Sequence, residues 1–218
     1  MGLATDGRLT ALRELHDSTY SHAEKLTVYM AEVLADAGLL TSDLDAVCVA
    51  RGPGSYTGLR IGVSAAKGLC YAMDIPLLSV NALQSLAHFA LDTVDSNELE
   101  TVRCIRPIID ARRMEVYSAC FNLEGNPIKG VEAVVVDSDS FRDELDRGPV
   151  LFIGDGAAKC KSVIVHPNAF FRADILPSAQ GMFMMAEWRL AANETEDVAY
   201  FEPFYLKDFV AGKAKKSE

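Results

Sequence analysis

The sequence lacks paired cysteines and long apolar runs. Its five cysteines stand singly in apolar contexts, at Cys48, Cys70, Cys104, Cys120 and Cys160. Because no two of them form a C-x-x-C pair and their number is odd, they are interpreted as reduced core residues. No stretch approaches the roughly 20 apolar residues of a membrane-spanning helix, and the N-terminus has no signal-peptide pattern. We therefore expect a cytoplasmic protein with no membrane partner.

Histidine is also scarce and dispersed. The four histidines are His16, His22, His88 and His166. None forms an H-x-x-x-H pair with another, so we expect no metal site, and His22 is interpreted as a capping or interface residue. A Ser/His/Asp triad is recognised by geometry and cannot be singled out from one sequence. No catalytic residue is predicted.

Basic residues are outnumbered. The chain has 31 acidic and 21 basic residues, which gives a formal net charge of −10. A surface of this charge repels a phosphate backbone, so direct binding of a nucleic acid is not expected. The only basic cluster, at 213–217, is interpreted as a solvated tail. With 218 residues, half of them apolar, the chain can bury the core of one two-lobed domain or of two small domains.

Glycine, in contrast, is concentrated in one stretch, RGPGSYTGLRIGVSAAKG, at residues 51–68. The apolar run before it, at 46–50, predicts a buried strand. A turn and then a helix over 57–72 follow, with Ser55 and Thr57 as caps of the helix. The turn is either an anion site or only a tight turn, since neither a nucleotide fingerprint nor a P-loop is complete. The turn residues are Arg51, Gly52, Pro53, Gly54 and Ser55.

The predicted helix carries a stripe of small residues. Gly58, Gly62 and Ala66 are spaced four apart, so they share one face that is almost without side chains. Such a face lets a second helix approach unusually closely. The stripe indicates either packing inside the same domain or a helix shared with another subunit.

Around this unit, the pattern alternates between strands and helices. Asp6-Gly7 predicts a hairpin turn, and 21–37 predicts an amphipathic helix with a Ser21/Glu24 capping box. A strand over 76–80 precedes a helix that Asn81 caps. Strand, helix, strand and helix in succession predict an α/β protein with parallel or mixed sheets flanked by helices. The polar stretch 92–100 predicts the boundary between the two lobes.

The second half of the chain predicts mainly strands. They cover 104–110, 115–122, 131–136 and 150–153, and a helix capped by Ser178 and an aromatic segment over 200–209 follow. A second glycine turn, Gly154-Asp155-Gly156, comes after the last strand. Two such turns in two lobes would suit a nucleotide cleft.

Four charges meet between the first two of these strands, at Asp110, Arg112, Arg113 and Glu115. Opposite charges placed so closely either pair to order the turn or form a functional surface. The sequence does not distinguish these two alternatives.

Several segments together resemble the TsaB (YeaZ) family. They are RGPGSYTGLRIGVSAAKGL, SHAEKL, SDLDAVCVA, IDARRMEVY and EPFYLKD, and the resemblance covers nearly the whole chain. It implies the two-lobed fold of actin, hexokinase and Hsp70 (ASKHA), with an N-terminal lobe over 1–97 and a smaller lobe over 98–218. Members of the family have about ten further residues ahead of the first hairpin. We therefore expect the first strand to be missing or shortened.

The resemblance also implies a role. It implies a scaffold subunit rather than an enzyme. Such a subunit belongs to the complex that makes threonylcarbamoyladenosine in tRNA, and it orders the catalytic subunit, TsaD. The partners so implied are TsaD, the ATPase TsaE and a second copy, with tRNA reached only through the complex. No cofactor is required by this role, and a nucleotide at the subunit interface is left open. The alternatives are an ATP-binding actin-like phosphotransferase and a glycoprotease-like metallopeptidase.

Family members pair through their first two helices, which correspond here to 21–37 and 57–72. The interface residues implied are His22, Leu26, Met30, Val33, Tyr56, Thr57, Gly58, Ile61, Gly62, Ala65 and Ala66.

Overall fold

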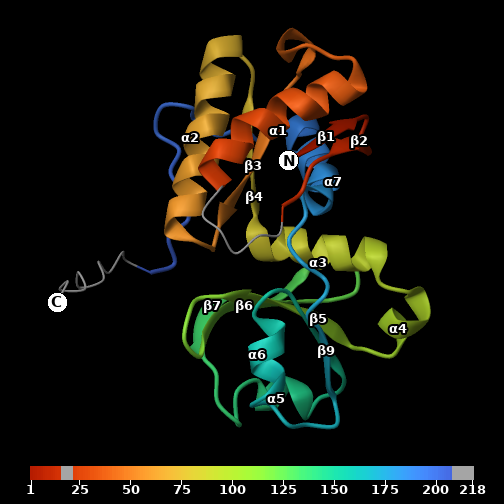
Figure 1. Ribbon diagram of the computed structural model, residues 1–218. Coiled ribbons are helices and arrows are strands. Elements are labelled where there is room, and N and C mark those ends of the chain that lie inside the picture. Colours follow the sequence, from red (N-terminus) through yellow and green to blue (C-terminus); the bar gives the residue numbers. More distant parts are fainter. Residues whose placement is uncertain (16–21, 208–218) are drawn as a thin grey trace, which may run out of the picture.

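The computed structural model describes residues 1–15 and 22–207. Figure 1 shows two stacked lobes. The upper lobe holds α1, α2, α7 and the strands β1 to β4, and the lower lobe holds β5 to β9 with α4, α5 and α6. The helix α3 (Ala82–Thr93) runs between them and packs on strands of both. In the described ranges, no helix is both long enough and apolar enough to cross a bilayer.

The chain opens with a hairpin of β1 (Gly2–Thr5) and β2 (Arg8–Leu12), which pair antiparallel. Asp6 and Gly7 form the turn with φ angles of 50° and 70°. Both residues occupy the left-handed region that a two-residue hairpin turn requires, which confirms the prediction from Asp6-Gly7. The first strand is short, with four residues.

A parallel β-α-β unit forms the centre of the upper lobe. β3 (Val47–Gly52) pairs with β4 (Leu77–Asn81), and α2 (Tyr56–Met73) connects them. The Ser55 hydroxyl accepts a hydrogen bond from the Gly58 N–H at 3.4 Å and caps α2. The predicted strand, glycine turn and helix are therefore confirmed.

The helix α1 (His22–Ala37) packs on α2 and on the hairpin. Val33 is buried in one cluster with Leu3 and Ala11. The predicted capping box involves Ser21 and the side chain of Glu24, which both lie outside what the structure describes. A short 3₁₀ turn, η1 (Thr41–Asp43), leads from α1 towards β3.

Asn81 begins α3 as predicted, since its side-chain oxygen accepts hydrogen bonds from the N–H groups of Leu83 and Gln84. The polar stretch at 92–100, where the lobe boundary was predicted, is partly helical. It contains the short helix α4 (Ser96–Glu100), because Asp95 caps the free N–H of Asn97. One turn of helix is too short to produce a hydrophobic period.

The lower lobe contains one mixed sheet in the order β7-β6-β5-β8-β9. β5, β8 and β9 run parallel, whereas β6 and β7 are antiparallel to their neighbours. The strands are β5 (Cys104–Asp110), β6 (Glu115–Phe121), β7 (Pro127–Val135), β8 (Val150–Ile153) and β9 (Ala169–Arg172). Two short helices, α5 (Arg142–Leu145) and α6 (Ala157–Lys161), complete the lobe.

The strand β7 begins earlier than the sequence predicted. β7 begins at Pro127 rather than at Val131. Proline is tolerated there because β7 is an edge strand, whose outward N–H groups need no partner in the sheet. The side-chain oxygen of Asn122 accepts from the N–H of Asn126 at 2.7 Å and closes the turn.

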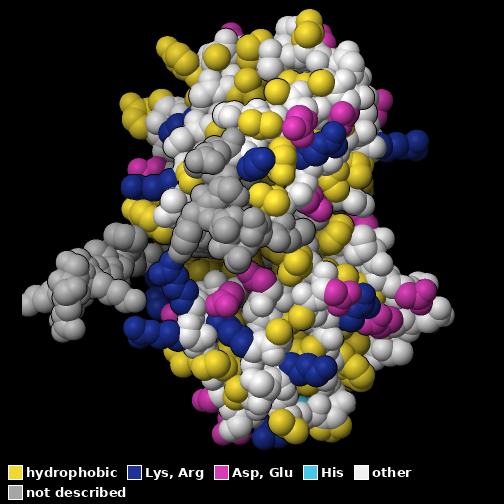
Figure 2. Space-filling view, in the orientation of Figure 1, with side chains coloured by type: hydrophobic (Ala, Val, Ile, Leu, Met, Phe, Trp, Pro, Cys, Tyr) yellow, Lys and Arg dark blue, Asp and Glu magenta, His cyan; other side chains and the backbone are white. Residues whose placement is uncertain are grey.

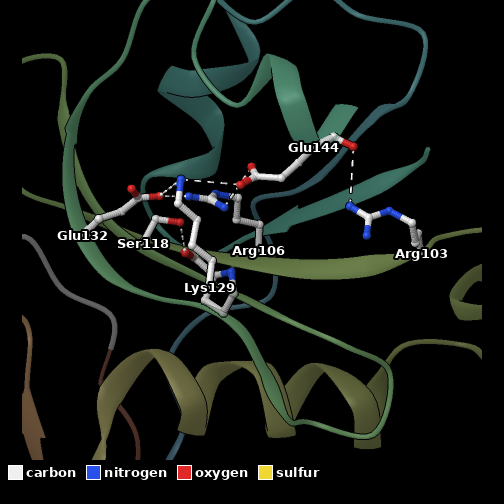
Figure 3. A network of polar contacts seen from close by, with 7 residues as sticks. Arg103, Arg106, Ser118, Lys129, Glu132 and Glu144 are labelled. Carbon is white, nitrogen blue, oxygen red and sulfur yellow. Dashed lines mark hydrogen bonds and ion pairs between the residues drawn. The ribbon is translucent and has the colours of Figure 1, made fainter. Parts of the chain in front are cut away.

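A charged network is buried inside the lower lobe (Figure 3). The Arg106 side chain has no exposed surface and pairs with Glu132 of β7 and with Glu144 of α5, at 2.9 Å for Glu144. The guanidinium carbon lies 4.1 Å from the centre of the Phe141 ring. Lys129 contacts the same two carboxylates at 3.1 and 3.5 Å. These charges therefore connect β5, β7 and α5.

The end of the described chain returns to the upper lobe. After the predicted cap Ser178 come a 3₁₀ turn, η2 (Ala179–Met182), and α7 (Phe183–Ala191). α7 packs on β4, and Met185 is buried as core. The boundary predicted at residue 97 stays a prediction.

Candidate functional site

The inner face of α2 belongs to the core of the upper lobe. Ala66 is buried together with Cys70 and Leu77. A methyl group added at Gly62 would lie 3.7 Å from the Val49 side chain. Two of the three small residues in the predicted stripe therefore face this chain's own sheet, while Gly58 is exposed.

Both charges of α2 are turned towards the C-terminal segment. The Lys67 ammonium donates to the carbonyls of Ala199 and Phe201 at 3.1 and 2.9 Å. The Arg60 Nε donates to the Tyr205 hydroxyl at 3.2 Å. The sequence of α2 contains no other charged residue, so the rest of its surface is uncharged. The segment after residue 199 thus packs along α2 as far as residue 205.

The outer face of α2 is uncharged and mostly small. Tyr71 is 84% exposed, and a methyl group at Gly68 would meet no atom of the described residues within 4 Å. Figure 2 shows hydrophobic side chains over the upper lobe, where α1 and α2 lie. We call this the outer face of α2; its members are Thr57, Ile61, Ser64, Ala65, Gly68, Tyr71 and Ala72.

The remaining predicted interface residues are placed differently from one another. Leu26 and Met30 of α1 are partly exposed, whereas Val33 is buried. The ring of Tyr56 lies 4.9 Å from that of Tyr205, so it contacts the C-terminal segment. The side chain of His22 lies outside the described part.

The two glycine turns are filled by the chain itself. Gly52 has φ +110° and lies against the Phe204 carbonyl, with room for no side chain. The Phe204 N–H donates to the Arg51 carbonyl at 2.7 Å. Gly154 and Gly156 pack against Ile108 of β5 in the same way. The glycines therefore allow close packing of backbone on backbone at both turns.

The two turns do not both adjoin the cavity beside Arg51. A cavity of about 410 Å³ adjoins Arg51 and is lined further by residues of β4, α3 and α7. Gly154, Asp155 and Gly156 are not among its lining residues. The nucleotide cleft that the paired turns suggested stays a prediction.

The charged loop pairs with residues that sequence reasoning missed. Lys159 of α6 contacts the Asp110 carboxylate at 2.5 Å and donates to the Glu115 carbonyl at 2.7 Å. Lys207 contacts the Glu115 carboxylate at 2.7 Å. Arg112 and Arg113, with φ angles of 71° and 51°, are exposed, and neither guanidinium has an ion-pair partner in the described ranges.

Sequence reasoning also missed most of the cavity next to Arg51. Its further polar and aromatic residues are Asn81, Gln84, Trp188 and Arg189. Trp188 is the only tryptophan of the chain, which is a weak signal, and nothing in the sequence pairs α7 with the end of β3. Within residues 1–15 and 22–207, no group of three His, Cys, Asp or Glu side chains is placed to hold a metal.

Comparisons with known proteins decide the family. A family model described as "TsaD: tRNA N6-adenosine threonylcarbamoyltransferase" matches residues 16–215. The tRNA threonylcarbamoyladenosine biosynthesis protein TsaB of Escherichia coli is 28% identical over 219 residues, which cover 98% of this chain and 91% of that protein. The chain belongs to the TsaB family.

A second TsaB protein, from Bacillus subtilis, is 34% identical over 148 residues. The match covers 66% of this chain and 61% of the length of that relative.

Two solved structures agree with the fold. A crystal structure titled as a protein "with similarity to peptidase YEAZ from Pseudomonas aeruginosa" has a TM-score of 0.79 and 26% identity, and covers 94% of this chain and 93% of that one. A structure titled "YeaZ from Pseudomonas aeruginosa" has a TM-score of 0.76 and 28% identity, with coverages of 94% and 92%. The predicted α/β, two-lobed actin-like fold is confirmed.

Proposed function

We propose that this chain is a non-catalytic subunit of the complex that transfers a threonylcarbamoyl group to an anticodon-loop adenosine of tRNA. In this role it binds the catalytic subunit, TsaD, through α1 and the outer face of α2, and orders it for the transfer. The proposal rests on the names of the curated relatives, which are tRNA threonylcarbamoyladenosine biosynthesis proteins. It rests equally on the uncharged outer face of α2.

The outer face of α2 suits a helical partner for two reasons. First, Arg60 and Lys67 are directed towards the C-terminal segment, so the outer face itself contains no charge that a partner would have to strip of water. Second, Gly68 lets a second backbone approach closely, and Tyr71 offers a large aromatic side chain beside it. Uncharged centres with an aromatic anchor are typical of protein interfaces.

Co-purification with the same organism's TsaD tests the proposal. We expect the wild-type chain to form a complex of defined size, measured by chromatography with light scattering before and after mixing. Gly68→Arg places a long charged side chain on the outer face and should weaken the complex at least about tenfold, or about 1.4 kcal/mol. The variant should fold well, because arginine favours a helix more than glycine does.

Gly130→Arg is the matched control. An added methyl group at Gly130 likewise has no neighbour within 4 Å in the described part of the chain, but Gly130 lies on β7 of the lower lobe. It should leave the complex unchanged. Equal affinity of TsaD for wild-type and Gly68→Arg chains would contradict the assignment of the outer face of α2.

Lack of catalysis is tested separately. We expect the isolated chain to transfer no threonylcarbamoyl group, and its addition to TsaD to raise the transfer rate.

TsaE and a second copy of the chain are further proposed partners, and tRNA is reached only through the complex. The glycine turns filled by the chain's own backbone favour this role over a phosphotransferase. Calorimetry with ATP and Mg²⁺ should accordingly detect no tight binding to the isolated chain.

A further inference from the structure

The cavity of about 410 Å³ lies where two parallel strands end. It opens at the carboxyl ends of β3 and β4, beside the first turn of α3, and α7 forms its opposite wall. Ends of parallel strands are frequent ligand sites in α/β proteins, and this volume lies within the usual range for small-molecule sites. The cavity is separate from the outer face of α2, to which none of its lining residues belongs.

One positive charge in the cavity is uncompensated. The Arg51 guanidinium has no hydrogen-bond or ion-pair partner among the residues that the structure describes, and its Nε atom is buried. An anion seated in the cavity would supply the opposite charge that this guanidinium lacks.

The second arginine of the cavity is already neutralised. Arg189 donates to the Ser79 carbonyl at 2.5 Å. Its guanidinium also lies 3.4 Å from the Glu196 carboxylate and 3.7 Å from that of Glu194. Glu194 also lines the cavity, but its carboxylate lies beside Arg189, so Arg51 is the lining charge that has no opposite charge next to it among the described residues.

The other walls divide into donors and apolar surface. The Asn81 side-chain oxygen is occupied by the N–H groups of α3, which leaves its NH₂ group as a donor. The side-chain amide of Gln84, which also lines the cavity, has no hydrogen-bond partner within residues 1–15 and 22–207. Val80, Met185 and Trp188 contribute apolar and aromatic surface to the same cavity. A ligand with one anionic end and one apolar or aromatic part matches both kinds of wall.

We propose that this cavity binds a small organic anion, a carboxylate or phosphate monoester that carries an apolar or aromatic group. Arg51, with Asn81 and Gln84, receives the anionic oxygens. Trp188 and Met185 contact the apolar part. The shared chemistry is a compact anion of one or two charges, and the two ligand types are separated by the choice of probe.

The single tryptophan makes the test direct. Fluorescence of Trp188 is recorded while phenyl phosphate, benzoate, inorganic phosphate or benzyl alcohol is added. We expect a saturable change with phenyl phosphate, benzoate or both, and a response at least about tenfold weaker to the uncharged benzyl alcohol, since Arg51 contacts only the anion. A response that rises linearly without saturation, as collisional quenching does, would overturn the proposal.

Variants connect the signal to the cavity. Arg51→Gln should weaken organic-anion binding at least about tenfold, and Arg147→Gln, which changes an exposed arginine of the lower lobe, should not. Ala192→Phe, at an exposed position of the lining, fills the cavity and should also abolish binding. Thermal unfolding verifies that each variant is folded. If Arg51→Gln fails to fold, Ala192→Phe decides: a folded Ala192→Phe chain that still binds overturns the proposal.

Discussion

Arg106 of β5 forms ion pairs with residues of two other elements, β7 and α5. Its side chain is buried, and its positive charge forms ion pairs with the carboxylates of Glu132 and Glu144. A buried pair contributes little compared with apolar residues of the same size, but loss of one member leaves a charge without a partner. The lower lobe therefore depends on this arginine more than its polar character suggests.

We predict that Arg106→Met lowers the free energy of unfolding by up to about 3–5 kcal/mol, because Glu144 then keeps a largely buried charge whose remaining partner, Lys129, lies 3.5 Å away. Urea denaturation measures the change. Arg142→Met is the control, since the exposed Arg142–Asp139 pair at 3.4 Å should contribute less than about 1 kcal/mol. Adding Glu132→Gln and Glu144→Gln to Arg106→Met should restore part of the loss; no recovery would show that charge is not the cause.

His88 is the second residue with a measurable consequence. It lies between the lobes on α3, where its ring meets Trp188 edge-on at 6.1 Å and packs against the turn at Gly125. Burial lowers the pKa of His88 below the ordinary value of 6.5, and the Asp92 carboxylate opposes this only in part. Since protonation then favours the unfolded chain, the contribution of His88 to stability is present above that value and is lost as the pH falls below it.

We predict that the free energy of unfolding falls more steeply in the wild-type chain than in His88→Gln as the pH is lowered from about 7.5 to about 5. Urea denaturation at intermediate pH values gives both slopes. Identical slopes would mean that His88 titrates alike in the folded and unfolded chains.

Among the elements, α3 depends most clearly on one capping residue. The side-chain oxygen of Asn81 accepts from two N–H groups of the first turn. We predict that Asn81→Ala lowers the free energy of unfolding by about 1 kcal/mol and that Asn81→Asp, which keeps the acceptor, does not. Thermal unfolding of both variants measures this. Equal melting temperatures for the two would contradict a capping role.

The two faces of α2 explain what the sequence could and could not predict. A local pattern was enough for the hairpin at Asp6-Gly7, the turn at Gly52 and the cap at Asn81, because each depends on residues within four positions of one another. The spacing of Gly58, Gly62 and Ala66 also predicted a helix face correctly. It could not decide what covers that face, since Val49 and Leu77 approach it only in the folded sheet.

The candidate functional residues follow the same rule. Arg51 was predicted from the glycine turn, but the cavity that it lines needs α7, more than 130 residues later. The charged loop was predicted to pair within itself or to form a functional surface. Its acidic members instead pair with Lys159 and Lys207, whose approach depends on the tertiary fold.

At the scale of the whole molecule, charge limits what the chain binds alone. With a net charge of −10, we predict no saturable binding of tRNA to the isolated chain below about 10 µM at about 0.15 M salt. Fluorescence anisotropy with labelled tRNA measures this. Binding at micromolar concentration that weakens steeply with salt would instead point to a basic contact such as Arg112 and Arg113.

The placement of α7 has a consequence for synthesis on the ribosome. The hairpin at the start of the chain rests on α7, where the Gly7 N–H donates to the Glu187 carboxylate at 3.1 Å, and β4 is covered by the same helix. The five strands of the lower lobe, in contrast, are complete once residue 172 has emerged. During vectorial translation the lower lobe can therefore close first. The lobe proposed to meet TsaD is finished last, so a nascent chain cannot recruit its partner before it is almost fully made.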